Sequence, residues 1–331
     1  MSHTNRLSLA EQAGFRLGLR PLVTFVVFAF NQERYIAKAI EGALSQDYSP
    51  LEVIISDDCS GDSTYEIIQN AAHNYSGPHK IVINRNPINL GLVRHLSHVF
   101  NMASGDIIVI SAGDDVSLPD RVSIIQRCFT QFPKAKAVFT NGMTINEKDD
   151  AIRPWSNWQK LHVWDSLLQR LIEGGANFLY GFSAAYKKEL IVDFPEIDAR
   201  ILQEDVLLSI RALLLGEAVY LPDMTVNYRC HADSCFSRLF RDNAGRARYW
   251  ENQSALCEQA IKDCFFRWSG RNNRQDRDDR LIRRLYWESH FSDLNRRFCH
   301  EKGIGRLICG IRLLQISLLR RISARVRKWI L

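Results

Sequence analysis

The stretch from Ile107 to Asp115, IIVISAGDD, constrains the fold more than any other part of this chain. Its β-branched run is typical of a strand that is buried on both faces. The strand ends at small residues followed by two adjacent carboxylates, Asp114 and Asp115. Ligands of open α/β sheets bind beyond the carboxyl ends of the strands, and neighbouring acids repel each other unless a cation or a donor-rich ligand lies between them. The pattern therefore predicts a site for a divalent metal on a diphosphate; the alternative is a solvated turn.

Strand and helix patterns alternate from residue 21 to about residue 237. Strand-like sequences are separated by amphipathic helical ones; the strand-like sequences are LVTFVVFAF, LEVIIS, HKIVINR, IIVIS and KAKAVFTNG. This alternation predicts an α/β fold with a mostly parallel central sheet and flanking helices. The polar, tryptophan-containing stretch from Glu147 to Lys160 is expected to be a surface excursion, and EAVYLPDMTVNYRCH is expected to form a late strand or a pair of strands.

The charge of the chain changes sign near residue 238. The net charge is +6, but residues 1–237 carry 21 Lys and Arg against 27 Asp and Glu, whereas residues 238–331 carry 22 against 10. With 331 residues, 46% of them hydrophobic, the chain can bury a substantial core. We interpret residues 1–20 as a leader, residues 21–237 as the main domain and residues 238–331 as a basic helical C-terminal region.

The cysteines and the termini predict a cytoplasmic protein. The eight cysteines include no CxxC pair, which favours reduced thiols, and Cys230 and Cys235 around His231 lack the second pair of a zinc site. Residues 1–20 show no signal-peptide pattern, and no apolar run is long enough to span a bilayer.

Residues 304–331, IGRLICGIRLLQISLLRRISARVRKWIL, combine seven Lys and Arg with many Leu and Ile. This composition suits a helix on an anionic membrane surface, which would place the protein at the inner face of the plasma membrane. It suits equally well a helix packed on the main domain. No nucleic-acid recognition module is visible, so we expect no nucleic-acid partner.

Five stretches occur in an order that resembles the family 2 glycosyltransferases of the bacterial surface-polysaccharide type. They are VTFVVFAFN, EVIISDDCSGDST, NRNPINLGLVRHLSHVF, ISAGDD and QEDVLL, within residues 21–237. The resemblance implies a GT-A (Rossmann-like) fold and inverting transfer of a sugar from a nucleotide-diphosphate donor, UDP or dTDP linked. It also implies a glycan or lipid-linked acceptor and a Mg²⁺ or Mn²⁺ cofactor.

The resemblance assigns one group of residues to the nucleotide donor: Phe30, Asn31, Glu33, Asp57, Asp58 and Arg94. An acid at the end of the second strand can accept from a base N–H or from ribose hydroxyls; helix capping, its alternative, is available to Asp62 or Ser63. Glu33 can equally be an acid favoured by the helix dipole, and Arg94 an ordinary exposed helix residue.

The metal motif departs from the family pattern, because Ala112 stands where the first acid of D-x-D is common. The resemblance then makes Asp114 the direct metal ligand and Asp115 a contact to a sugar hydroxyl or to a group that binds the metal. Diphosphate oxygens and water would complete the coordination, as hard cations prefer. His231 is a further candidate near the metal, and a structural histidine is the alternative.

Glu204 and Asp205 match the family's E-D motif, in which the second acid is the general base. In an inverting displacement, the base must lie across the sugar from the leaving diphosphate, so the resemblance assigns Asp205 to proton abstraction with Glu204 beside it. The alternative is an acidic pair that is stabilised by a helix N-terminus.

Three other functions would each require or allow different residues at these positions. A nucleotidyltransferase needs a glycine-rich phosphate loop after the first strand, and AFNQER contains no glycine. A NAD-dependent oxidoreductase needs G-x-G-x-x-G, which follows none of the strands. A non-catalytic sugar-nucleotide-binding or membrane-associated scaffold protein of the same fold stays open because of Ala112.

Overall fold

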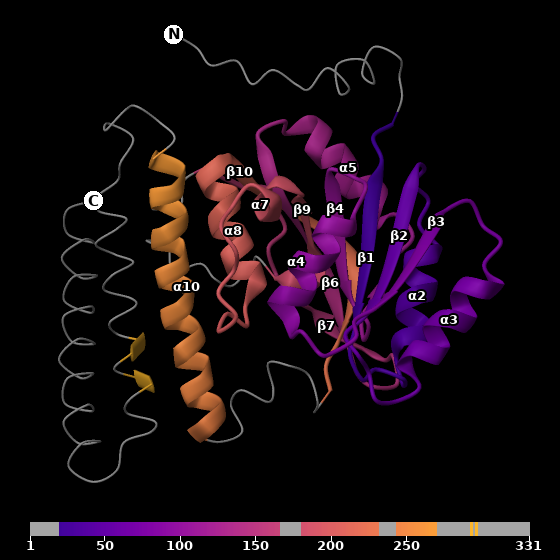
Figure 1. The fold of residues 1–331 in the computed structure, drawn as a ribbon. Coiled ribbons are helices and arrows are strands. Elements are labelled where there is room, and N and C mark those ends of the chain that lie inside the picture. Colours follow the sequence, from indigo (N-terminus) through magenta and orange to yellow (C-terminus); the bar gives the residue numbers. More distant parts are fainter. Residues whose placement is uncertain (1–19, 166–179, 232–242, 270–291, 294, 297–331) are drawn as a thin grey trace.

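The computed structural model describes residues 20–165, 180–231, 243–269, 292, 293, 295 and 296. Within these residues, a ten-stranded sheet has the order β3-β2-β1-β4-β9-β6-β10-β5, with β7 paired to β6 and β8 to β10. Helices lie on both sides of the sheet, α2 and α3 on one side and α8 and α10 on the other (Figure 1). The predicted α/β fold is therefore confirmed. The predicted leader up to residue 19 and the basic segment 304–331 lie outside the described residues.

The first half of the sheet is parallel, as predicted. Its strands are β1 (Val23–Ala29), β2 (Leu51–Asp57), β3 (Lys80–Arg85) and β4 (Ile107–Ala112). Their helices are α2 (Ile36–Leu44), α3 (Thr64–Asn74) and α4 (Leu92–Met102). Ala29 lies opposite Asp57, and Phe28 lies opposite Ala112. The carboxyl ends of these strands therefore meet at one edge of the sheet.

The second half of the sheet is mixed. Its strands are β5 (Val116–Ser117), β6 (Ala135–Ile145), β7 (Ala151–Pro154), β8 (His162–Trp164), β9 (Ala184–Lys187) and β10 (Glu217–Arg229). Its helices are α5 (Arg121–Gln131), η2 (Gly181–Ser183), α7 (Glu189–Val192) and α8 (Glu204–Leu215). β9 is antiparallel to β4 and β6, whereas β6 and β10 are parallel. The late segment is thus one long strand with register shifts.

The segment from Glu147 to Lys160 lies mostly at the surface, as expected, but part of it is a regular strand. Residues Ala151–Pro154 form β7, which pairs antiparallel with β6. Main-chain hydrogen bonding to a neighbouring strand is independent of side-chain polarity, so the polar composition concealed this hairpin.

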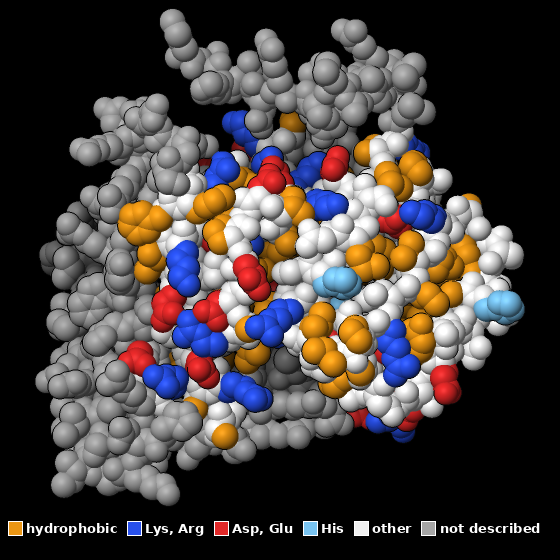
Figure 2. Space-filling model, viewed as in Figure 1, with side chains coloured by type: hydrophobic (Ala, Val, Ile, Leu, Met, Phe, Trp, Pro, Cys, Tyr) orange, Lys and Arg blue, Asp and Glu red, His pale blue; other side chains and the backbone are white. Residues whose placement is uncertain are grey.

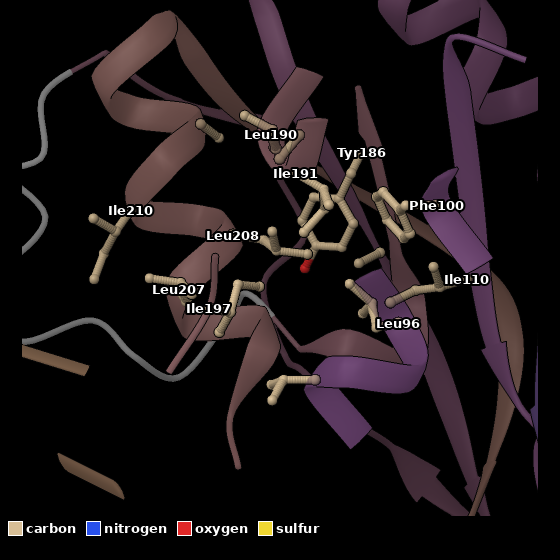
Figure 3. Packing of buried hydrophobic residues seen from close by; sticks show 14 of the residues in the cluster. Leu96, Phe100, Ile110, Tyr186, Leu190, Ile191, Ile197, Leu207, Leu208 and Ile210 are labelled. Carbon is tan, nitrogen blue, oxygen red and sulfur yellow. The ribbon is translucent and has the colours of Figure 1, made fainter. Parts of the chain in front are cut away.

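Strands with apolar side chains on both faces divide the core into two clusters. In β1, Phe25 and Val27 pack in the cluster that contains residues of α2, α3 and α5, and Val26 packs in the cluster of α4, α7, α8 and α10. This alternation follows from the two-residue repeat of a strand. In the second cluster, Leu208 of α8 points toward Tyr186 of β9 (Figure 3).

Helix α10 (Asn243–Ser269) packs against α8 and contributes Leu256, Ile261 and Cys264 to the same cluster. The domain boundary near residue 238 stays a prediction. Across the described ranges, none of the helices combines the length and the apolar character that crossing a membrane requires.

Candidate active site

The loops after β1 and β2 are joined by hydrogen bonds at the carboxyl edge of the sheet. The N–H of Asn31 donates to Ser60 Oγ (2.9 Å), and Asn31 Oδ1 accepts from the N–H of Gly61 (2.9 Å). Glu33 Oε2 accepts from the N–H of Ser63 (3.0 Å). Phe30 is 43% exposed beside these contacts. The structure thus brings the candidate residues after β1 against the loop that carries Asp57 and Asp58.

Asp58 is almost fully buried and organises the loop after β3. Its Oδ1 accepts from Asn86 Nδ2 (2.8 Å) and from the N–H of Leu90 (2.8 Å), and its Oδ2 accepts from the N–H of Gly91 (2.9 Å). Both oxygens therefore have partners within the protein. Contact between this acid and a base stays a prediction, and the observed role of Asp58 is to shape the loop after β3.

Asp57 is also buried and holds its own loop. Its carboxylate accepts from the N–H of Ser60 (3.0 Å) and lies 3.4 Å from Nε of Arg85. The first N–H of α3, that of Thr64, donates to Asp62 Oδ1 (3.0 Å), so Asp62 and not Asp57 pairs with this end of the helix. The capping alternative therefore does not explain Asp57.

Arg94 lies in the first turn of α4 and is exposed. The helix begins after Gly91, whose φ of +75° is accessible to glycine at little cost. A contact of Arg94 with phosphate or base stays a prediction.

Glycine at position 113 lets the turn after β4 lie close to the loop after β1. A Cβ on Gly113 would lie 2.4 Å from Gln32 Oε1, 2.9 Å from Ile36 Cδ1 and 3.1 Å from the carbonyl oxygen of Phe28. The N–H of Gly113 donates to that carbonyl (2.8 Å). This close approach to the loop after β1 fixes the acids that follow.

Asp114 Oδ2 lies 2.9 Å from Nε2 of His231, and their side chains are 16% and 9% exposed. This separation of 2.9 Å is the distance of a hydrogen bond or ion pair, and it also equals the roughly 3 Å between adjacent ligands of an octahedral ion; the Asp114 oxygen is the type of ligand that hard divalent cations prefer. No cluster of three or more His, Cys, Asp and Glu suited to a metal occurs in the described ranges. Diphosphate oxygens and water would have to supply the remaining ligands.

Asp115 is buried between two arginines. The N–H of Arg229 donates to its Oδ1 (2.8 Å), and Arg229 Nε donates to the carbonyl oxygen of Asp114 (2.9 Å). Burial and the charge of Asp114 hold the pKa of Asp115 well above its usual value, while Arg121 and Arg229 oppose this shift. A direct contact of this buried carboxyl with a sugar hydroxyl stays a prediction.

Arg121 was not predicted from the sequence. It connects the end of β4 to η2. It is fully buried, and it donates to Ser117 Oγ (2.8 Å) and to the carbonyl oxygens of Ile110 (2.8 Å) and Phe182 (3.1 Å). Burial lowers its pKa to about 9, and the charge of Asp115 opposes that shift. Its only sequence signal is a position beside Val122 at the start of an amphipathic helix.

Glu204 and Asp205 open α8, and Asp205 faces η2. Asp205 Oδ2 accepts from the N–H of Gly181 (3.1 Å), and its Oδ1 accepts from the N–H of Val206 (2.8 Å). A Cβ on Gly181 would lie 2.7 Å from Glu204 Oε1, so glycine allows this approach. Burial, and secondly the charge of Asp205, raise the pKa of Glu204 to about 8. Glu204 therefore keeps its proton at neutral pH.

The turn η2 thus connects the two acidic parts of the site. Gly181 donates to Asp205, and the carbonyl of the next residue, Phe182, accepts from Arg121, which is close enough to Asp115 for their charges to interact. The acids after β4 and at the start of α8 are therefore linked through one turn.

An aromatic cluster that the sequence did not predict adjoins Asp205. The ring centroid of Trp155 lies 4.8 Å from that of Tyr180, 5.3 Å from Phe182 and 4.7 Å from Tyr228. Burial and the charge of Asp205 raise the pKa of Tyr180, which places this ring beside the acid. Trp155 directly follows β7, Tyr180 directly precedes η2, and Phe182 and Tyr228 belong to η2 and β10.

Residues 24–194 match the family model described as Glycosyl transferase family 2. The matched segment is more than half of the chain, so this protein belongs to that family, and its fold is the GT-A fold of these glycosyltransferases.

Solved structures agree with the fold, and a sequence relative of similar length matches most of this chain. An uncharacterized protein of Mycobacterium tuberculosis is 29% identical over 236 residues; these cover 70% of this chain but only 64% of the relative. TarS residues 1–349 of S. aureus, in complex with UDP-GlcNAc, has a TM-score of 0.59 at 14% identity and covers 91% and 92% of the two chains. The mannosyltransferase PcManGT from Pyrobaculum calidifontis, in complex with GDP-Man and Mn²⁺, has a TM-score of 0.54 at 16% identity and covers 93% and 87%.

Proposed function

We propose that this protein transfers a sugar from a nucleotide-diphosphate donor to a hydroxyl of a glycan or lipid-linked acceptor, with inversion at the anomeric carbon. One observation carries the proposal: η2 is linked to both acidic regions, because the N–H of Gly181 donates to Asp205 and the carbonyl of Phe182 accepts from Arg121, whose charge interacts with that of Asp115. An inverting displacement needs the diphosphate and the base on opposite faces of one sugar. Acids from β4 and α8 that are linked through one turn support a single site of this kind.

The donor side would consist of the Asp114–His231 pair and the loops after β1, β2 and β3. Asp114 and His231 would hold Mg²⁺ or Mn²⁺, which when bound neutralises charge on the leaving diphosphate. Arg229 fixes the main chain of Asp114 and the side chain of Asp115. The nucleotide would lie against the surface around Phe30 and Asn31, which the buried Asp57 and Asp58 shape from beneath.

The acceptor side would consist of Asp205 and its surroundings. The acceptor oxygen forms a bond to C1 of the sugar while the bond from C1 to the diphosphate oxygen breaks, and the hydroxyl proton passes to the Asp205 carboxylate. General base assistance of this kind contributes about 10²- to 10⁴-fold. Glu204, protonated at neutral pH, adds no second negative charge beside that base.

The donor base, the acceptor and the location are finer proposals. TarS was solved with UDP-GlcNAc and PcManGT with GDP-Man, which supports a nucleotide-sugar donor without selecting the base. UDP-linked or dTDP-linked donors remain our proposal. The basic sequence of residues 304–331 supports action in the cytoplasm at the inner face of the plasma membrane.

A panel of UDP-, dTDP- and GDP-sugars tests this function on the full chain with and without Mn²⁺. We expect one donor class to raise the melting temperature and to release nucleoside diphosphate in a metal-dependent reaction. A ligand at 100 times its Kd adds about 2.7 kcal/mol to the free energy of unfolding. Stabilisation without release would favour the scaffold protein instead, and the absence of any stabilisation would contradict nucleotide-sugar binding.

A further inference from the structure

Asn252 reaches from α10 to the two residues that precede the acidic pair of α8. Its Oδ1 accepts from the N–H of Leu202 (2.6 Å) and from the N–H of Gln203 (3.3 Å). Its Nδ2 donates to Gln203 Oε1 (2.8 Å). Asn252 is fully buried, and unmet backbone donors in a buried place carry a free-energy penalty. One side chain therefore pairs with three polar groups next to Glu204.

Gln203 is the N-cap residue of α8, directly before the first helical residue, Glu204. Its orientation therefore sets the direction of the first helical turn. Its carbonyl accepts the first helical hydrogen bond, from the N–H of Leu207 (3.4 Å). Its side chain makes no capping bond to α8 and instead accepts from Asn252 and from Gln253 Nε2 (2.5 Å). The N-terminal turn that contains Asp205 is thus held from outside, by α10.

Helix α10, which carries Asn252, is itself held against α8 by a buried ion pair. Nε of Arg211 donates to Asp263 Oδ2 (2.7 Å), and both side chains are fully buried. Nη1 and Nη2 of Arg211 also donate to the carbonyl oxygens of Leu190 (3.0 Å) and Pro195 (2.8 Å). Helices α8 and α10 lie side by side (Figure 1). A functional group held by a rigid neighbouring element keeps its geometry better than one on an unsupported loop.

We propose that Asn252, on a helix beyond the family-matched residues 24–194, is a positioning residue for Asp205. The inference rests on the proposed role of Asp205 as the base. Displacement of a catalytic group by about 1 Å can lower a rate about 10²-fold, so the loss of this contact acts on turnover. We expect the donor affinity to stay unchanged, because the proposed donor site is formed by β1 to β4 and their loops.

The test compares Asn252→Leu, Asn252→Asp and Glu258→Gln in the full chain. Glu258 is the matched control, because it joins α10 to the same loop through an exposed ion pair with Arg200 (2.7 Å). Acidic and basic side chains lie intermingled on the face over α8 and α10 (Figure 2). Hydrolysis of UDP-GlcNAc and of GDP-mannose with Mn²⁺ gives kcat and KM, with water as acceptor. Hydrogen exchange of the Leu202 and Gln203 amides reports the contact directly.

We expect Asn252→Leu to lower kcat about 10- to 100-fold, to leave the donor KM within about twofold, and to remove the protection of the two amides. Asn252→Asp keeps an oxygen that accepts both N–H groups and loses only the donor to Gln203 Oε1, which still accepts from Gln253 Nε2. This variant should retain kcat within about threefold and keep the protection. Glu258→Gln should match the wild type in both measurements.

Three outcomes overturn the inference. Loss of amide protection in Asn252→Leu with an unchanged kcat would show that the contact is structural only. Parallel changes of kcat, KM and melting temperature, without rescue in Asn252→Asp, would show the same. Asp205→Asn separates the two proposals: a fully active Asp205→Asn would overturn the proposed base, whereas an inactive Asp205→Asn beside a fully active Asn252→Leu would overturn only the role of Asn252.

Discussion

His231 Nε2 lies 2.9 Å from Oδ2 of Asp114, although 117 positions separate the two residues in the chain. β10 brings them together, because Arg229 at its end binds both the side chain of Asp115 and the main chain of Asp114. The late strand therefore brings His231 to the acids that follow β4, where our proposal needs a second ligand because Ala112 replaces the first acid of the family motif.

Removal of either partner should weaken metal-dependent nucleotide binding. For the wild type, Mn²⁺ should increase the rise in melting temperature that UDP or GDP produces. Asp114→Asn should abolish this increment and His231→Ala should reduce it, because each removes a metal ligand. Asp120→Asn, an exposed carboxylate at the start of α5, is the control and should behave like the wild type. An Asp114→Asn variant with an undiminished Mn²⁺ increment would exclude this residue as a ligand.

Glu204 should make the protein less stable as the pH rises from about 4.5 to about 8. The unfolded chain ionises this group near its ordinary pKa of 4.5, whereas the folded protein retains the proton until about 8. Between these values only the folded state binds the proton, so the free energy of unfolding falls with rising pH. Glu204→Gln carries no such proton. Urea denaturation from pH 5 to pH 9 should show the variant gaining stability relative to the wild type; a difference that is constant with pH would contradict the raised pKa.

Asp58→Asn should loosen the loop after β3. The amide offers one acceptor oxygen where the carboxylate uses two for Asn86, Leu90 and Gly91, so at least one donor loses its partner, at about 1–3 kcal/mol. Urea denaturation measures this loss, and calorimetry with UDP and Mn²⁺ should show weaker nucleotide affinity. Asp106→Asn, exposed at the opposite end of the sheet, is the control. Nucleotide affinity that is unchanged despite lost stability would separate this loop from the nucleotide side.

Asp263→Ala should be strongly destabilising. It leaves Arg211 buried without its counter-charge, and breaking a buried pair in this way typically costs about 3–5 kcal/mol. Glu258→Gln breaks a half-exposed pair five residues earlier on α10 and should cost about 1 kcal/mol or less. Thermal and urea denaturation of both variants check the contrast. Equal stabilities would mean that the ion pair does not fix α10 to α8.

The parts of the fold that sequence analysis predicts are those set by local pattern. The β-branched runs identify β1 to β4, and the acids beyond β2 and β4 follow directly from where those strands end. The start of α8 is likewise visible in Glu204 and Asp205. These features depend on residues within a few positions of one another, so one sequence is enough to find them.

The missed parts depend on contacts between distant segments. Arg121 and Arg229 are buried only because carbonyl oxygens and carboxylates from other elements meet them, and arginine is ordinarily exposed. Trp155 joins the cluster beside Asp205 because β7 pairs with β6, which polar composition conceals. Asn252 looks like any polar helix residue until α10 meets the start of α8.

Asp205→Asn gives the most direct test of the account, with turnover and donor binding measured on the same protein. The amide keeps the size of the side chain and an oxygen for the Gly181 N–H, but it cannot accept the proton of the attacking hydroxyl. We predict that Mn²⁺-dependent release of nucleoside diphosphate from the preferred sugar nucleotide falls about 10²- to 10⁴-fold while donor affinity stays within about twofold. Release at the wild-type rate with the same donor would contradict the assignment of Asp205 as the base.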